Sequence, residues 1–218
     1  MKISKETNSI LKNYATINGN LLLKPGNRIN TISANKTIAS SVSVVESFPS
    51  EFGIYDLNAF LGALSLFTDP DLEFNDKYVI IREHNNTIKY FAADASILTT
   101  PQKDIVFPDA DISFDLSGSL LETIHRTAGV LKASDLSVVG QSGQLILEVG
   151  DKKNVTSNSY ETVVGTTDKV FRANIKIENL KMMRSDYVVT ISSKRISRFA
   201  SVSGDLVYYT ALENDSSF

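Results

Sequence analysis

The 218-residue chain contains no cysteine, so disulfides, thiolate metal sites and cysteine nucleophiles are excluded. This absence fits a reducing compartment. Histidine is scarce as well: the chain has only His84 and His125, and neither stands near a second ligand at a spacing typical of zinc sites. A histidine-based metal site is therefore disfavoured. We expect His84, which precedes two asparagines, to be an exposed turn residue.

The common phosphate-binding and catalytic motifs are also missing. The chain has neither a Gly-x-x-x-x-Gly-Lys-Ser/Thr loop nor a Gly-x-Gly-x-x-Gly fingerprint. The segment closest to a nucleophile elbow, at 140–143, is better interpreted as a hairpin turn. An acidic cluster could bind a cation, but it lacks the glycine and the closing glutamate of an EF-hand, which favours a solvated loop. Its members are Asp69, Asp71, Glu73 and Asp76. We expect no enzyme activity, metal or cofactor; a hydrolase built on Asp and Ser residues remains an alternative without a motif.

Long apolar runs are absent, and none approaches the roughly 18 residues of a membrane-spanning helix. The N-terminal sequence MKISKETNSILKN has no apolar stretch after Lys2, so we expect no signal peptide and no membrane association. Positive charge is not in excess either, because the net charge is −3 and the pI is about 5.5. This average argues against a strong nucleic-acid binder, although it leaves room for a local basic surface.

What the chain does contain is many short strands. Runs rich in Val, Ile, Tyr and Thr are separated by turn residues, which is typical of antiparallel sheets. The runs do not alternate one-for-one with long helices, so a parallel doubly wound sheet is disfavoured and an α+β fold is expected. The predicted strands are 37–45, 78–81, 87–91, 145–149, 187–192 and 206–212.

Four segments have helical character, two in each half of the chain. In the first, over 4–17, the apolar residues Ile10, Leu11, Tyr14 and Ile17 share one sector of a helix. Ser4 is the candidate N-cap, and the lysines of this segment share a face opposite the apolar sector. The lysines are Lys5 and Lys12.

The corresponding segment of the second half, 117–132, has an apolar stripe of its own. His125 and Arg126 lie on its polar side and Lys132 at the margin. Glu122 stands four residues before Arg126, a spacing that allows an ion pair along the helix. The stripe consists of Leu121, Ile124, Ala128 and Leu131. Two shorter helices are predicted within 53–67 and 174–184, the second carrying Lys181 and Arg184.

The order of elements thus occurs twice. Each half has an amphipathic helix, a short helix and a closing β-rich stretch. The segment 92–108 has two prolines and no sustained period, so we interpret it as a linker. We place the boundary near Pro108, which gives domains 1–108 and 109–218, each large enough for its own core.

Four extended strings carry a resemblance to a known family. They are MKISKETNSILKNYATIN, IYDLNAFLGALSLF, FAADAS and VYYTALENDSSF. The chain resembles the DNA polymerase sliding clamps of T-even-type bacteriophages. The resemblance spans the full length, and it is strong over residues 1–18 and 54–67 and weak between 116 and 169.

This resemblance implies a ring of three subunits, each with two similar domains whose helices line the hole and whose antiparallel sheets form the outside. It implies that the ring encircles duplex DNA, is loaded by an ATP-dependent clamp loader, tethers the replicative polymerase and supports late transcription, in the cytoplasm of the infected bacterial host. A sliding tether must bind DNA weakly, which an acidic chain with a few lining cations allows. The alternative function is a β-rich component of the virion.

The resemblance also turns the helix charges into candidate DNA contacts, whereas periodicity alone favours ordinary solvated charges. The predicted DNA-facing residues are Lys5, Lys12, His125, Arg126, Lys132, Lys181 and Arg184. The helix within 53–67 has no basic residue, so that stretch of lining would rest on polar and backbone groups. A pocket for partner peptides is expected near the linker and the C-terminal strand, with core packing as the alternative role of its residues. Its candidates are Ile97, Leu98, Tyr209 and Leu212.

Overall fold

The computed structural model describes residues 1–154 and 156–218. The chain divides into two compact units, Met1–Asp104 and Ile105–Phe218. The division lies four residues before the predicted boundary at Pro108. Both units combine helices with antiparallel strands, which confirms the expected α+β class.

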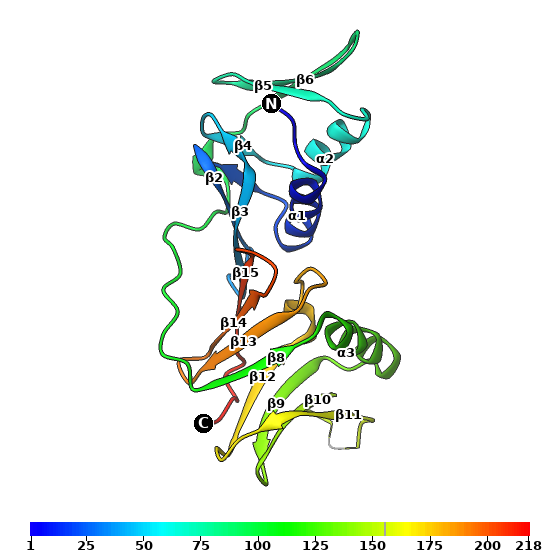
Figure 1. Cartoon of the computed structure of the whole chain (residues 1–218), viewed down its shortest axis with the longest axis vertical. Coiled ribbons are helices and arrows are strands. Elements are labelled where there is room, and N and C mark those ends of the chain that lie inside the picture. The colour runs from blue at the N-terminus through cyan, green and yellow to red at the C-terminus, as the bar shows by residue number, and fades with distance from the viewer. Residues whose placement is uncertain (155) are drawn as a thin grey trace. The chain divides into compact units, whose positions relative to one another are not determined.

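Unit 1 consists of two α-helices, seven strands and a 3₁₀ turn. They are α1 (Lys5–Ile17), β1 (Leu21–Leu23), β2 (Gly26–Ile32), β3 (Ile38–Phe48), β4 (Phe52–Ile54), α2 (Leu57–Ser65), β5 (Asp71–Phe74), β6 (Tyr78–Glu83), β7 (Asn86–Phe91) and η1 (Ala95–Ile97). The strand pairs are β1–β4 and β2–β3, and β5, β6 and β7 form a meander. Helices α1 and α2 lie side by side on one side of β2 and β3 (Figure 1).

In unit 2, the residues that the structure describes form one α-helix, eight strands and a 3₁₀ turn. They are β8 (Ile112–Leu116), α3 (Gly118–Leu131), β9 (Asp135–Gln141), β10 (Gln144–Gly150), β11 (Tyr160–Thr166), β12 (Phe171–Lys176), η2 (Ile177–Asn179), β13 (Tyr187–Ser192), β14 (Ile196–Ser201) and β15 (Val207–Ala211). Strands β11, β10, β9 and β12 form one sheet in that order. Strand β13 pairs with β8 and β14, and β14 pairs with β15.

The two units repeat one topology. The pairs β1–β4 and β2–β3 of unit 1 correspond to β9–β12 and β10–β11 of unit 2. The meander β5–β6–β7 corresponds to β13–β14–β15. Even β8, which pairs with β13, has a rudimentary counterpart: Met1 exchanges two backbone hydrogen bonds with Leu72 of β5, both 2.7 Å long. Apart from the short helix predicted in the second half, the duplicated order predicted from the sequence is therefore present in three dimensions.

The prediction of a fourth helix within 174–184 is wrong. Its first residues belong to β12, where Asn174 and Ile175 pair with β9 and are buried. The remainder forms only η2, which has no side-chain cap, and a segment without regular structure. Few residues of the segment are left after β12, and the hydrogen bonds of so short a helix do not offset the free energy of nucleation. Two tyrosines satisfy the backbone instead, because Met183 donates to Tyr208 Oη at 3.3 Å and accepts from Tyr187 Oη at 2.5 Å.

The predicted linker 92–108 begins as part of unit 1. Ala93 donates its N–H to the Gly53 carbonyl at 2.8 Å, and Leu98 is buried. Further along, Thr99 exchanges hydrogen bonds with two asparagines that follow α1, Asn18 and Asn20. Gly53 has to be glycine, because a Cβ there would lie 2.3 Å from the Ala93 carbonyl oxygen. About the first half of the segment is thereby attached to the sheet and to the residues that follow α1.

Candidate nucleic-acid interface

Helix α1 is fixed at its N-terminus by two side chains. Ser4 is the N-cap and accepts the Thr7 N–H at 3.1 Å, as predicted. The buried carboxylate of Glu46, on β3, accepts the Ser4 N–H and the Thr7 hydroxyl. Burial raises the pKa of Glu46, but these hydrogen bonds outweigh it, so its pKa lies below the ordinary value. The charged carboxylate also suits the positive end of the helix dipole.

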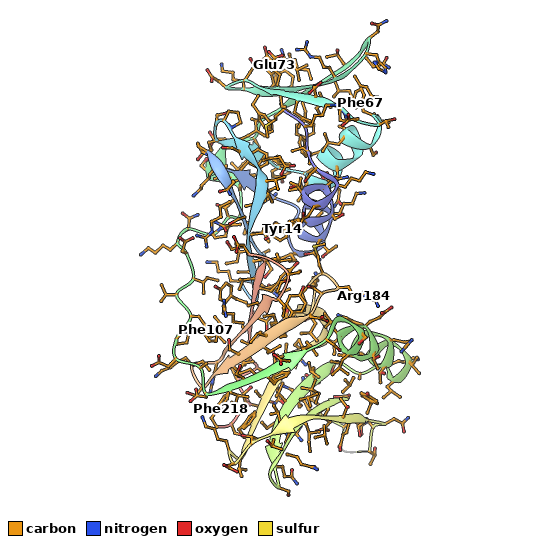
Figure 2. All side chains as sticks on the ribbon, in the orientation of Figure 1. Tyr14, Phe67, Glu73, Phe107, Arg184 and Phe218 are labelled. Carbon is orange, nitrogen blue, oxygen red and sulfur yellow. The ribbon has the colours of Figure 1, made fainter. Side chains whose placement is uncertain are left out.

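One face of α1 is basic and open. Lys5, Asn8 and Lys12 all line a groove of about 440 Å³ beside α2, and both lysine side chains are exposed. The opposite face is anchored by Tyr14, which is fully buried and hydrogen-bonded to the Ser40 hydroxyl at 2.9 Å (Figure 2). Because the core side is fixed, the lysines are held on the side turned away from the strands.

Helix α2 adds no charge to this groove. Its lining residues are Leu61, Leu64 and Ser65, and its N-cap Asp56 accepts the Ala59 N–H at 2.9 Å. As the sequence indicated, any contact that α2 makes with a polyanion must rest on hydroxyl and backbone groups. The positive charge of the groove comes from α1.

Helix α3 holds the equivalent position in unit 2. Ser117 caps it by accepting the Leu120 N–H at 3.2 Å, the same arrangement as at Ser4. Arg126 is exposed and lies 3.5 Å from the Thr123 hydroxyl. His125 is exposed, yet partial desolvation of its ring lowers its pKa, while a hydrogen bond to the Leu180 backbone opposes the change. A histidine with a lowered pKa is mostly neutral at pH 7, which weakens His125 as a DNA contact.

The other predicted cations surround α3. Lys132 is its C-cap, in the left-handed conformation with φ of 54°, and Lys181 is exposed. The guanidinium of Arg184, which Figure 2 labels, lies 3.2 Å from the Glu122 carboxylate. The spacing in the sequence allowed Glu122 to pair with Arg126 along the helix, but its ion-pair partner in the structure is Arg184. Helical spacing could not predict this pair, because Arg184 lies outside α3 and far from Glu122 along the chain.

Comparisons with known proteins identify the family to which the chain belongs. Residues 4–100 match the family model described as DNA polymerase processivity factor. The sliding clamp of Vibrio phage KVP40 is 34% identical, with 98% of this chain and 99% of the relative covered. The sliding clamp of Enterobacteria phage T4 is 32% identical, with coverage of 99% and 98%. The chain belongs to the sliding-clamp family.

Solved structures agree with this assignment at the level of the fold. The solved structure described as "C-terminal region of FEN-1 bound to A. fulgidus PCNA" superposes with a TM-score of 0.70 at 12% identity, covering 96% of this chain and 95% of that one. The clamp is thus the processivity factor of a phage DNA polymerase. The alternative of a virion component finds no support in these relatives.

The candidate peptide-binding residues of the clamp differ in accessibility. Ile97 is 59% exposed, whereas Leu98 and Leu212 are buried in their own units. Tyr209 is half-buried, and its ring lies 6.3 Å from that of Phe107. Only Ile97 and Tyr209 therefore present surface to a partner without a rearrangement.

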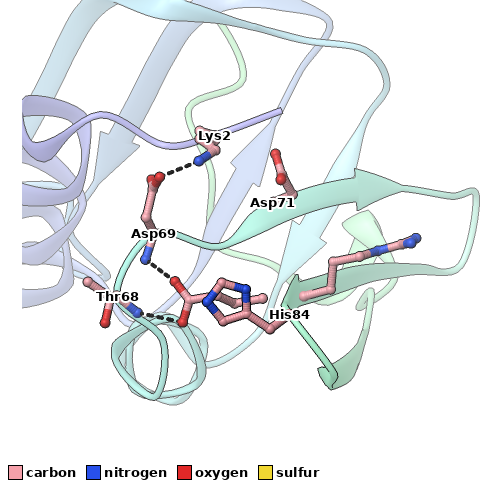
Figure 3. Close-up of a pocket in the computed structure, with 7 residues that line it drawn as sticks. Lys2, Thr68, Asp69, Asp71 and His84 are labelled. Carbon is pink, nitrogen blue, oxygen red and sulfur yellow. Dashed lines mark hydrogen bonds and ion pairs between the residues drawn. The ribbon is translucent and has the colours of Figure 1, made fainter.

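The acidic cluster is held by the clamp's own cations. Lys2 pairs with Asp69, and Arg82 pairs with Glu73 (Figure 3 shows the first pair). Glu83 accepts the Thr68 and Asp69 N–H groups, which lowers its pKa. Asp71 and Glu73 lie in β5 and not in the predicted loop. Among the described residues, no group of three or more His, Cys, Asp or Glu side chains is placed to hold a metal ion, and no helix has the length and apolar character needed to cross a membrane.

Proposed function

We propose that three copies of this clamp close into a ring around duplex DNA, with α1 and α3 of each copy facing the DNA. The observation that carries the proposal is similarity over almost the whole chain to the phage sliding clamps. The repeated topology supports it, because each unit presents a capped helix with exposed cations on the side turned away from its strands.

The proposed lining grips DNA weakly. Lys5, Lys12 and Arg126 are the strongest candidates, and Lys132 and Lys181 stand at the margins. Each phosphate neutralised by a cation adds salt-dependent affinity, so a short row of cations centres the duplex without holding it in place. Phosphate contacts carry no sequence information, which suits a clamp that must slide over any sequence.

Ring closure calls for strand edges that can pair between copies. Strand β7 is an edge of the meander in unit 1, and β11 is an edge of the four-stranded sheet β11–β10–β9–β12 in unit 2. Both expose apolar side chains, Phe91 at 65% and Val163 at 55%. We propose that β7 of one copy pairs head-to-tail with β11 of the next, a heterologous contact that closes after three rotations.

The proposed partners follow from membership of the family. They are the phage DNA polymerase, an ATP-dependent clamp loader and late-transcription factors, all in the cytoplasm of the infected bacterial host. The clamp acts by tethering and not by catalysis. Ile97 in unit 1 and Tyr209 in unit 2 are each proposed, separately, to contact apolar anchors of partner peptides, by analogy with the FEN-1 segment in the structure described as "C-terminal region of FEN-1 bound to A. fulgidus PCNA".

The proposal is tested with the triple variant Lys5→Ala, Lys12→Ala, Arg126→Ala in a primed-template assay with polymerase and loader. We expect shorter products and a lower loading rate at physiological salt, because three lining charges per subunit are lost. Native mass spectrometry and negative-stain imaging of the wild type should show a closed trimer with a hole wide enough for duplex DNA. A strict monomer at every concentration would contradict the ring.

A matched control removes the same charge elsewhere. Lys24→Ala, Lys77→Ala, Lys103→Ala changes three exposed lysines outside the helices. It should load and support synthesis like the wild type. If both triple variants behave alike, net charge and not the helix face governs DNA contact.

A further inference from the structure

Arg184 is held in place by its neighbours in the chain. Just before it, Met183 has both backbone groups hydrogen-bonded to tyrosine hydroxyls. Just beyond it, the Asp186 carboxylate accepts the N–H of Gly118, the first residue of α3, at 2.8 Å. The segment carrying Arg184 is thereby fixed against the start of α3, although it has no regular secondary structure.

The side chain of Arg184 then runs along α3. A Cβ on Gly118 would lie 3.0 Å from the Ser185 carbonyl oxygen and 3.3 Å from Arg184 Cγ, so glycine allows this close approach. The guanidinium ends at Glu122, one helical turn beyond Gly118, at 3.2 Å. Both side chains are open to solvent, with 70% of Arg184 and 55% of Glu122 exposed. The ion pair is therefore positioned by the backbone but remains accessible to a competing anion.

Unit 1 has no carboxylate at the matching place on its helix. Lys5, Asn8 and Lys12 line one groove, and Asn8, one turn before Lys12, is a neutral amide. In unit 2 the corresponding face carries Glu122 one turn before Arg126. Helix α3 thus carries a carboxylate, Glu122, beside its cations, and this carboxylate forms an ion pair with Arg184.

We propose that Glu122 restrains Arg184 and so sets how strongly unit 2 grips the DNA backbone. This inference rests on the proposed function, in which α3 faces the duplex. The Arg184 guanidinium exchanges between two anions, the Glu122 carboxylate and a DNA phosphate. While it is paired with Glu122 it makes no phosphate contact, and the ring slides with one contact fewer per subunit.

The experiment follows loaded clamps on long duplex DNA by single-molecule tracking over a series of salt concentrations. Glu122→Gln keeps the shape of the side chain and frees Arg184. We expect diffusion to slow about two- to five-fold at low salt, the scale set by an exposed ion pair. The salt dependence should steepen by about one phosphate contact per subunit.

A double-mutant cycle identifies Arg184 as the responsible cation. Arg184→Gln should diffuse at least as fast as the wild type at low salt, because it removes the phosphate contact that Arg184 makes whenever it leaves Glu122. Glu122→Gln should then have little effect in the Arg184→Gln background. If it slows diffusion equally there, the effect belongs to Arg126 or to general charge and the inference is overturned. An unchanged salt dependence in the Glu122→Gln clamp overturns it as well.

Two controls separate this inference from the proposed function. Glu51→Gln removes an exposed carboxylate outside the helices and should leave diffusion unchanged. An equal effect of Glu51→Gln would overturn the role of Glu122. If the wild type itself never forms a loaded ring, the proposed function fails; if it loads and slides but Glu122→Gln changes nothing, only the inference fails.

Discussion

Helices α1 and α3 occupy equivalent positions but are anchored differently. At the centre of α1, fully buried Tyr14 bonds Ser40, and α2 packs alongside. The corresponding position of α3 is Ala128, and in place of a second helix there are η2 and the segment around Met183. A repeated topology therefore does not require repeated packing. In unit 1, the helix is held by Tyr14 and by packing against α2. In unit 2, the tyrosine hydroxyls of Tyr187 and Tyr208 hold the irregular segment around Met183 instead.

The buried carboxylates differ in the same way. In unit 1, Glu46 binds neutral donors at the start of α1. In unit 2, Asp135 is 1% exposed and accepts from Lys176 at 2.6 Å, with Lys152 3.8 Å away. Lys152 also pairs with Asp215, which lies in the C-terminal tail. The carboxylate of unit 1 thus orients a helix, whereas that of unit 2 belongs to an ionic network that fastens the tail to the sheet.

The largest expected difference in folding stability is between substitutions at the centres of α1 and α3. Tyr14→Ala should destabilise the protein by about 4 kcal/mol, because it leaves a cavity in unit 1 and removes a buried hydrogen bond. The matched change, Ala128→Gly, should cost about 1 kcal/mol, mainly through helix propensity. Chemical denaturation followed by far-UV circular dichroism measures both. Equal losses would mean that α3 depends on its central residue as much as α1 does.

The buried carboxylates give the next largest effect. Asp135→Asn should cost about 3 kcal/mol at pH 7, because Lys176 and Lys152 then lose their buried counter-charge. Glu46→Gln should cost about 2 kcal/mol, since its partners are neutral. Denaturant titrations of both variants and the wild type at pH 7 test this order. A larger loss for Glu46→Gln would show that the ionic network matters less than the cap of α1.

The pH dependence of stability sharpens this second prediction. Burial raises the pKa of Asp135, but hydrogen bonds from Lys176 and Ser134 and the charges of both lysines outweigh it, so its folded pKa lies below the ordinary value. The carboxylate therefore stabilises the fold above its unfolded pKa of about 3.9, and this contribution is lost as the pH falls through the folded pKa. The Asp135→Asn variant should lose less stability than the wild type between about pH 5 and pH 3.

The sequence predicted the parts of the fold that depend on neighbours in the chain. Helices α1 and α3 agree within a residue with the predicted segments, because apolar spacing and a serine cap are local signals. All six predicted strands are present, as β3, β6, β7, β10, β13 and β15. The fourth helix failed because β9 recruits Asn174 and Ile175 as strand partners, a tertiary choice that propensity does not record.

The candidate interface was less predictable. Charge on a polar face identifies Lys5, Lys12 and Arg126 as exposed, but it does not show which cations are already paired. The partner of Glu122 comes from a segment far along the chain, and Asp186 reaches α3 in the same manner. Such contacts are determined by how the strands fold back, so only the three-dimensional structure reveals them.

The smallest expected effect is at the helix caps, where the two units are most alike. Ser4→Ala and Ser117→Ala each remove one cap hydrogen bond and should each cost about 1 kcal/mol. Ser4 differs in having Glu46 on its own N–H, whereas at α3 the Asp186 carboxylate binds the following residue, Gly118. Because Glu46 also binds Thr7, the cap of α1 and this carboxylate act on one turn. Ser4→Ala should therefore be non-additive with Glu46→Gln in denaturation experiments, whereas Ser117→Ala and Glu46→Gln, in separate units, should add within about 0.5 kcal/mol. Additivity in both pairs would show that Glu46 and Ser4 stabilise the helix independently.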